Sequence, residues 1–180
     1  MDNLTISLTM WGNLRGDYKW LEWYADMKKI FQMFELNITH LGATGSQYPK
    51  KVVTVARKEK EILKKIEDGN PLTDFSCYSL PKDYKAAVFD YNLLIYRESS
   101  LITLIAGKEY YEDKKIDSCI SVFNKYIDMN RGQIYEMDRK DTPWLYAFGE
   151  NDISFYKSLR VIKDSAYVGL PDGGDFWCER

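Results

Sequence analysis

Histidine and cysteine are scarce in this chain of 180 residues. It has one histidine, His40, and three scattered cysteines, Cys77, Cys119 and Cys178. A single imidazole excludes any site within one chain that needs a pair of histidines, such as an H-E-x-x-H zinc site. No two cysteines have the C-x-x-C spacing, which indicates reduced thiols in a cytosolic protein rather than a disulfide framework or a zinc knuckle. We expect Cys77 and Cys119, which lie among apolar neighbours, to be small core residues.

The sequence also has no long apolar run and almost no excess of charge. No stretch approaches the ~18 apolar residues that cross a bilayer, and the start of the chain lacks the pattern of a secretory signal. Lys and Arg number 25 against 27 Asp and Glu, a formal charge of −2, whereas a general nucleic-acid binder has a basic excess. We therefore expect a cytoplasmic protein that binds neither nucleic acid nor membrane.

Motifs for phosphate binding and covalent catalysis are missing as well. The glycine-containing segment 42–46 lacks the lysine that follows in a P-loop, and no G-x-G-x-x-G occurs. A cysteine nucleophile would have to use His40 as its base, and no loop of small residues surrounds any cysteine. We predict that His40 is a partly buried residue at a strand end that hydrogen-bonds the backbone. The sequence indicates no metal and no cofactor.

One short pattern is compatible with catalysis. Metal-dependent nucleases often place acid-x-Lys at a strand edge, where carboxylates hold Mg²⁺ and the lysine orients the attacking water. Asp138-Arg139-Lys140 and Asp83-Tyr84-Lys85 both match. Such matches are common at this density of charged residues, and neither has a partner aspartate upstream on an adjacent predicted strand. We prefer a charged turn after a strand, and keep a Mg-dependent nuclease using Asp138 and Lys140 as an alternative.

Apolar periodicity predicts the secondary structure. Leu4 to Met10 alternate between apolar residues and threonine or serine, which is typical of a strand with one solvated or helix-free face. The predicted strands are 4–10, 73–80, 86–96, 100–106 and 133–137, with a short β-like piece at 38–41; the predicted helices are 17–36, capped by Asp17, then 53–68 and 113–130. This order favours a single α+β domain with an antiparallel sheet of about five strands and three main helices largely on one face.

The C-terminal part, residues 141–180, is harder to assign, whereas residues 4–140 form the predicted core of the domain. Residues 142–149 are an aromatic segment bounded by proline and glycine, which we interpret as a loop. Asn151 or Asp152 is placed to cap a short helix that continues to Ile162. The glycine-rich tail 171–177 favours irregular structure.

Aromatic residues are the feature in excess. The chain has 14 Tyr, 5 Trp and 8 Phe, 15% of its residues, which is more than a core of this size absorbs. Surface Tyr and Trp bury a large area at low entropic cost, so they are common at binding hot spots. The candidate partner-binding residues are Trp144, Tyr146, Phe148, Glu150 and Asp152. The alternative interpretation is that these rings close the open end of the sheet.

The overall layout resembles the small cytosolic α+β immunity proteins of bacterial polymorphic-toxin systems, both contact-dependent and type VI. The similarity covers 4–140: a strand ending in an aromatic, Leu8-Thr9-Met10-Trp11-Gly12, then an aromatic helix, a Lys/Glu-rich helix, strands and a third helix. It implies a non-catalytic inhibitor that binds and neutralises one cognate toxin, and acids on its surface would speed association with a basic toxin. A homo-oligomeric accessory or structural protein is a third alternative, which leaves a homodimer open.

Overall fold

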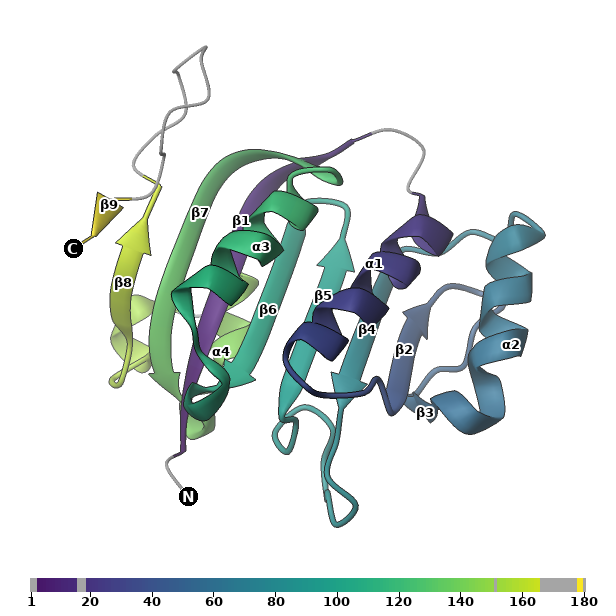
Figure 1. Ribbon diagram of the computed structural model, residues 1–180, viewed down its shortest axis with the longest axis horizontal. Helices are drawn as coiled ribbons and strands as arrows, with labels where there is room; N and C mark the ends of the chain where they lie inside the picture. Colours follow the sequence, from purple (N-terminus) through teal and green to yellow (C-terminus); the bar gives the residue numbers. More distant parts are fainter. Residues whose placement is uncertain (1–2, 16–18, 151, 166–177, 180) are drawn as a thin grey trace.

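A single antiparallel sheet organises the chain (Figure 1). The computed structural model describes residues 3–15, 19–150, 152–165 and 178–179. Within them the sheet has nine strands in the order β3-β2-β4-β5-β6-β1-β7-β8-β9, and every pair of neighbours is antiparallel. The strands are β1 (Leu4–Leu14), β2 (His40–Thr44), β3 (Val53–Thr54), β4 (Asp74–Ser79), β5 (Leu93–Glu98), β6 (Leu101–Gly107), β7 (Ile127–Asp138), β8 (Arg160–Asp164) and β9 (Cys178–Glu179).

Helices cover both faces of this sheet. The four α-helices are α1 (Trp20–Met33), α2 (Val55–Glu67), α3 (Asp113–Phe123) and α4 (Pro143–Ala147). In Figure 1, α1 and α3 lie over the near face, α2 lies beside β2 and β3, and α4 lies behind the sheet. The α+β class is therefore confirmed, whereas the estimate of about five strands is wrong. The sheet gains β3, β8 and β9, which are too short or too irregular to show an alternating pattern.

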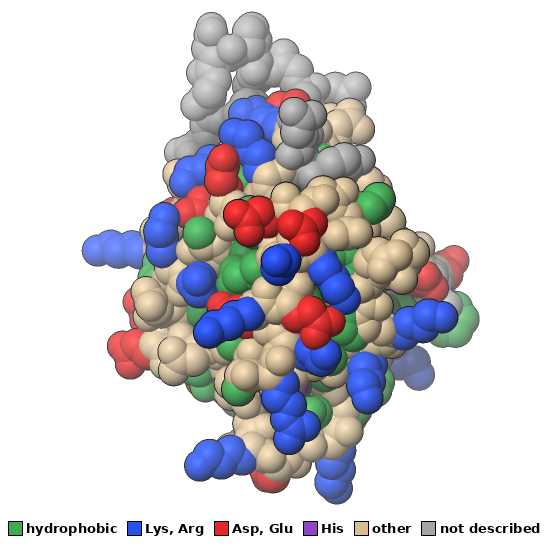
Figure 2. Space-filling model, turned by 90° about the vertical axis from the view of Figure 1, so that its right-hand side faces the viewer, with side chains coloured by type: hydrophobic (Ala, Val, Ile, Leu, Met, Phe, Trp, Pro, Cys, Tyr) green, Lys and Arg blue, Asp and Glu red, His purple; other side chains and the backbone are tan. Residues whose placement is uncertain are grey.

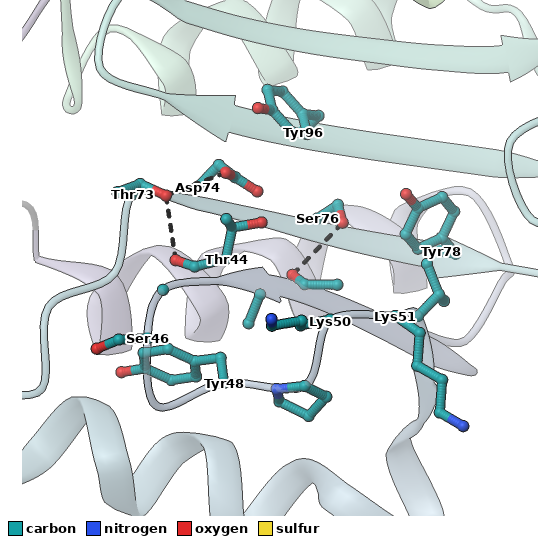
Figure 3. Close-up of a pocket in the computed structure, with 15 residues that line it drawn as sticks. Thr44, Ser46, Tyr48, Lys50, Lys51, Thr73, Asp74, Ser76, Tyr78 and Tyr96 are labelled. Atoms are coloured by element: carbon teal, nitrogen blue, oxygen red, sulfur yellow. Dashed lines mark hydrogen bonds between the residues drawn. The ribbon is translucent and has the colours of Figure 1, made fainter.

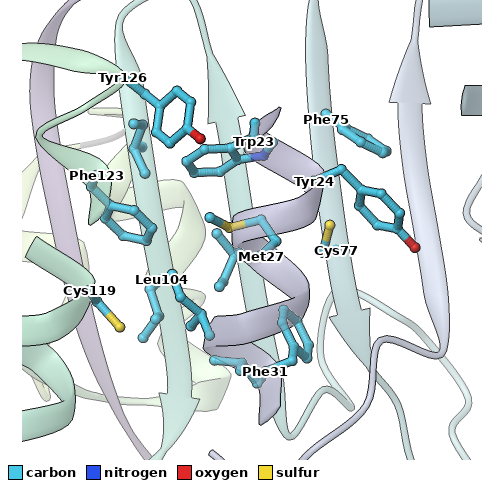
Figure 4. Close-up of a cluster of buried hydrophobic side chains, with 14 of the residues drawn as sticks. Trp23, Tyr24, Met27, Phe31, Phe75, Cys77, Leu104, Cys119, Phe123 and Tyr126 are labelled. Atoms are coloured by element: carbon cyan, nitrogen blue, oxygen red, sulfur yellow. The ribbon is translucent and has the colours of Figure 1, made fainter. Parts of the chain in front are cut away.

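The main core lies between the sheet and the helices α1 and α3 (Figure 4). Met27 and Phe31 of α1 meet Leu104 of the sheet and Phe123 of α3, and all four are at most 1% exposed. Full burial of a side chain of this size stabilises the fold by roughly 1.5–3 kcal/mol. The apolar spacing that predicts α1 thus marks the residues that hold it on the sheet.

A buried arginine lies in the same layer. Arg97 of β5 is 0% exposed, and its guanidinium carbon lies 4.3 Å from the ring centroid of Trp20. The rings of Trp23 and Tyr126 lie 5.2 Å and 5.1 Å away. The negative faces of aromatic rings attract a cation, so three of the surplus aromatics surround one buried charge.

Several predicted boundaries need correction. The helix predicted for 113–130 ends at Phe123, because Ile127 pairs with Leu14 and begins β7. The strand predicted for 86–96 begins only at Leu93. The residues before it form a turn, in which the Asp90 carboxylate accepts hydrogen bonds from the backbone N–H groups of Lys85 (2.7 Å) and Ala86 (2.8 Å). The helix predicted to continue to Ile162 is a 3₁₀ turn, Ile153–Phe155, followed by β8.

The first strand is longer than predicted. It continues to Leu14 through a change of register between Trp11 and Gly12. A Cβ at Gly12 would come within 2.0 Å of the carbonyl oxygen of Asp128, so glycine permits the close approach of β7 there. Helix α1 begins at Trp20, and the predicted cap Asp17 lies outside the described residues, as does the tail 171–177. Among the described helices, none has the length and apolar content to cross a membrane.

Candidate functional site

The predicted aromatic loop is in fact the short helix α4. Pro143 occupies its first turn, where the missing N–H costs nothing, and Gly149 follows its end with φ of 70°. Trp144 packs with Leu94 and Ile105, which alternate with sheet residues that face α1. Helix α4 therefore lies on the opposite face of the sheet from α1 and α3, where the sequence predicted a solvated or helix-free surface.

The polar side of β1 is buried beneath α4. Thr9 is 0% exposed, and its Oγ1 lies 2.8 Å from that of Thr103 and 3.2 Å from the hydroxyl of Tyr135. Tyr135 in turn donates to the carbonyl of Pro143 at 3.0 Å. Each of these three hydroxyls thus has a partner, as buried polar groups usually do. The solvated face predicted for β1 is wrong at these residues, because α4 covers it.

The structure divides the five predicted site residues into two groups. Trp144, Tyr146 and Phe148 are half-buried, whereas Glu150 and Asp152 are exposed. The Tyr146 hydroxyl donates to Gln133 Oε1 at 2.7 Å, so this ring is fixed on the sheet. The rings of the predicted site therefore cover the sheet in part, and the two carboxylates face solvent.

Two residues that the sequence analysis did not include complete this surface. Ile153 and Phe155 are 64% and 67% exposed, and the Asp152 carboxylate accepts the N–H of Ser154 at 3.0 Å, which holds the 3₁₀ turn that displays them. We call Glu150, Asp152, Ile153 and Phe155 the acidic–apolar turn. Their adjacency to the predicted acids is the available signal, although the apolar spacing of 153–162 predicts a helix instead.

A small hollow adjoins the acidic–apolar turn. It has a volume of about 210 Å³, and its lining includes Trp11, Arg131, Tyr146, Glu150, Ile153 and Tyr156. The guanidinium carbon of Arg131 lies 5.0 Å from the Trp11 ring, and Trp11 Nε1 donates to the carbonyl of Ala147 at 2.7 Å. We call this the turn hollow; it is large enough for one side chain of a partner.

A larger hollow lies on the same face of the sheet, beyond α4 (Figure 3). It has a volume of about 640 Å³ and lies between the segment 45–52 and the strands β2, β4 and β5. Tyr78 and Tyr96 line its strand side, and Lys50 and Lys51 lie on its loop side. We call this the loop hollow. Its residues come from separate parts of the sequence, so no local pattern predicted it.

The nuclease-like tripeptide has structural partners. The Asp138 carboxylate accepts the backbone N–H of Lys140 at 2.8 Å and so caps a 3₁₀ turn, Arg139–Asp141. Arg139 Nη1 donates to the carbonyls of Phe89 (3.1 Å) and Tyr91, and its guanidinium carbon lies 4.8 Å from the Tyr91 ring. Among the described residues, no group of three or more His, Cys, Asp or Glu side chains is arranged to hold a metal ion.

The histidine and the described cysteines are held away from solvent. Cys77 and Cys119 are 0% exposed, as predicted, and burial raises the pKa of both thiols, to about 12 for Cys119. His40 is 8% exposed and burial lowers its pKa. Its Nδ1 lies 2.9 Å from Thr39 Oγ1, so the partner is a side-chain hydroxyl rather than the predicted backbone group. The Cys178 side chain lies outside the described residues.

The α2 side of the molecule carries mixed charge (Figure 2). Glu61 accepts from Lys58 at 2.5 Å and from Lys65 at 2.9 Å, and these hydrogen bonds lower the pKa of Glu61 to about 2. Lysines and acids alternate here, as expected of a solvated helix face.

Comparison of the chain with protein-family models, with curated proteins and with solved structures found no match.

Proposed function

We propose that this protein is a non-catalytic inhibitor that binds and neutralises a cognate bacterial toxin, and that it acts as an immunity protein in the cytoplasm. The observation that carries the proposal is the acidic–apolar turn. Exposed large apolar side chains beside carboxylates and a hollow are typical of a surface that another protein covers. The similarity of layout to small α+β immunity proteins, over 4–140, supports the same function.

The charge of this turn indicates the kind of toxin. Glu150 and Asp152 are exposed, so they attract a basic surface at a distance and increase the rate of association. Nucleases and other enzymes that act on polyanions carry such surfaces. We therefore propose that the partner is a basic toxin domain, with Ile153 or Phe155 inserted into it and one of its side chains in the turn hollow.

The test is stoichiometric inhibition. The full chain is immobilised, partners are captured from a lysate of its native host, and the captured toxin domain is purified. Its activity is then measured as the inhibitor is titrated. We expect inhibition that is complete at an equimolar ratio, and a toxin gene next to the gene for this chain.

Two other outcomes would contradict the proposal. Cleavage of plasmid DNA or RNA by the purified chain with Mg²⁺, abolished by Asp138→Ala, would show a nuclease. Light scattering that shows a concentration-dependent oligomer, dissociated by Ile153→Ser with Phe155→Ser, would show that the turn binds a second copy of the chain.

A further inference from the structure

One carboxylate lines the loop hollow and a second lies beside it, and both lack a counter-charge. Asp74 of β4 lines the hollow, whereas Glu98 of β5 is not one of its lining residues but accepts the hydroxyl proton of the lining residue Tyr96 at 3.0 Å. Both acids are half-buried, and within the described residues neither forms an ion pair with a basic side chain. Burial, together with these two carboxylates, raises the pKa of Tyr96. Because removing a carboxylate from water is costly without a partner, the two acids favour a cation from outside.

The hydroxyl groups of the hollow are also acceptors. Thr73 Oγ1 lies within hydrogen-bond distance of two acceptors, the carbonyl of Thr44 (3.1 Å) and the Asp74 carboxylate (3.2 Å), and Ser76 Oγ donates to the carbonyl of Gly42 (3.4 Å). Tyr96 donates to Glu98. A hydroxyl has one proton to donate and two lone pairs to offer, so each of these oxygens can still accept a hydrogen bond. A ligand that satisfies them must be rich in N–H or O–H donors.

Lysines on the loop side determine where a cation can enter. Lys50 and Lys51 are exposed and lie across the hollow from Tyr96, and the Lys51 side chain runs away from the strands in Figure 3. They repel a basic group near the loop, so such a group must lie over β4 and β5. The floor there is closely packed at Gly42, where a Cβ would come within 2.3 Å of Ser76 Oγ.

We propose that the loop hollow receives a basic side chain of the protein partner, an arginine, between Asp74, Glu98 and the ring of Tyr96. This inference rests on the proposed function, because the same partner would contact the acidic–apolar turn. Arginine is favoured over lysine because its planar guanidinium has five donors and stacks on aromatic rings. The Tyr96 ring packs against Phe148 of α4 at 5.0 Å, so one partner can span α4 and reach both hollows.

The test uses a small probe that does not depend on the toxin. The isotope-labelled full chain is titrated with N-acetyl-arginine amide, and in parallel with N-acetyl-citrulline amide, which has the same shape without the charge. We expect the backbone amide signals of Asp74, Tyr78 and Tyr96 to shift with the arginine probe in the millimolar range. The citrulline probe should bind roughly tenfold more weakly, since it loses the charge-assisted hydrogen bonds.

Substitutions then test the residues. Asp74→Asn and Glu98→Gln should each weaken arginine binding about fivefold to tenfold, whereas the matched surface change Glu67→Gln should have no effect. Both acids lack ion pairs, so their neutralisation should not lower the melting temperature. If either variant fails to fold, Lys50→Ala remains, which should tighten binding by removing a repulsion.

Three results would overturn the inference: equal shifts with both probes, arginine shifts elsewhere on the chain, or binding unchanged by all three substitutions in the hollow. A toxin that binds the Asp74→Asn, Glu98→Gln double variant as tightly as wild type would also overturn it while leaving the proposed function intact. The absence of any toxin partner would contradict the proposed function and is detected separately, by the capture experiment.

Discussion

The ring of Phe148 on α4 meets the ring of Tyr96 on β5 edge-on, with centroids 5.0 Å apart and planes inclined by 64°. Tyr96 lines the loop hollow, and α4 continues into Gly149 and Glu150 at the turn hollow. This contact therefore connects the two hollows through one short helix. Edge-to-face pairs of this kind contribute about 0.5–1.5 kcal/mol beyond area burial, which adds to the packing of Trp144 that holds α4 on the sheet.

The acidic–apolar turn should be dispensable for folding and required for binding. Ile153→Ser with Phe155→Ser removes side chains that are 64% and 67% exposed, so the free energy of unfolding should change by less than about 1 kcal/mol. Affinity for the toxin should fall at least tenfold, or by roughly 1.4 kcal/mol. Calorimetry of toxin binding and thermal unfolding measure the two effects.

Trp144 provides the contrasting variant. It packs with the buried residues Leu94 and Ile105, so Trp144→Ala should lower the free energy of unfolding by about 2–4 kcal/mol. Trp144→Phe keeps most of the packing, and Trp144 Nε1 has no hydrogen-bond partner among the described residues, so this change should cost much less. If the Ile153→Ser, Phe155→Ser variant loses toxin binding only because it no longer folds, the acidic–apolar turn is structural and not a binding surface.

Arg139 should anchor the segment before β5. Its guanidinium donates to the carbonyls of Phe89 and Tyr91, so Arg139→Met should cost about 1–3 kcal/mol and speed hydrogen exchange between Ala86 and Tyr91. Arg139→Lys should not restore protection, because an ammonium lacks the planar fork. Lys140→Met is the neighbouring control and should leave exchange unchanged; equal effects at both positions would contradict the anchoring role.

Asp26 should make stability depend on acidity. Burial raises the pKa of this carboxyl, but hydrogen bonds from Lys29 (2.8 Å), Tyr126 (2.9 Å) and Lys125 (3.2 Å) outweigh burial, and the net pKa is lowered from the ordinary 3.8. A carboxyl whose pKa is lower in the folded state stabilises at neutral pH, and this contribution is lost as the pH falls through the lowered pKa.

Asp26→Asn should therefore lower the free energy of unfolding at neutral pH by about 1–2 kcal/mol, and the difference from wild type should shrink in strong acid. Urea unfolding across this pH range measures it. Tyr126→Phe removes one donor and keeps the ring, so it should show a smaller loss of the same sign. A pH-independent difference for Asp26→Asn would mean that packing rather than charge is responsible.

The described cysteines should be chemically inert in the folded protein. Cys77 and Cys119 are 0% exposed, and burial raises both pKa values, so almost no thiolate forms even in mildly alkaline buffer. In a Cys178→Ser variant under native conditions, a disulfide reagent should react with Cys77 and Cys119 only as fast as the chain unfolds. In denaturant, both thiols should react with the reagent. Rapid reaction of either thiol under native conditions would contradict the described core.

Local periodicity predicted the elements that bury one clear face. The alternation of 4–10 and the stripe from Trp20 to Phe34 correspond to β1 and α1, because each pattern reflects which side faces the core. Ile127 fits the helical spacing of α3 equally well, yet it pairs with Leu14 across the sheet. Pairing partners distant in the sequence decide such positions, and no single segment contains that information.

For the candidate site, the sequence pattern indicated the segment but not the exposure of its side chains. Clustering of rings and acids identified the segment around Trp144 and Glu150, but not which side chains face the solvent. That depends on α4 packing over Thr9 and Tyr135 of distant strands. The loop hollow combines β2, β4, β5 and the segment 45–52, so only the fold could assemble it.

The place of β1 in the sheet has a consequence for synthesis on the ribosome. β1 is synthesised before both of its neighbours in the sheet, β6 and β7, so its two edges stay open until those strands have been made. Open apolar strand edges are templates for misassembly. A nascent chain arrested before β6 should thus need a chaperone, and release from that dependence should coincide with the emergence of β7 from the ribosome.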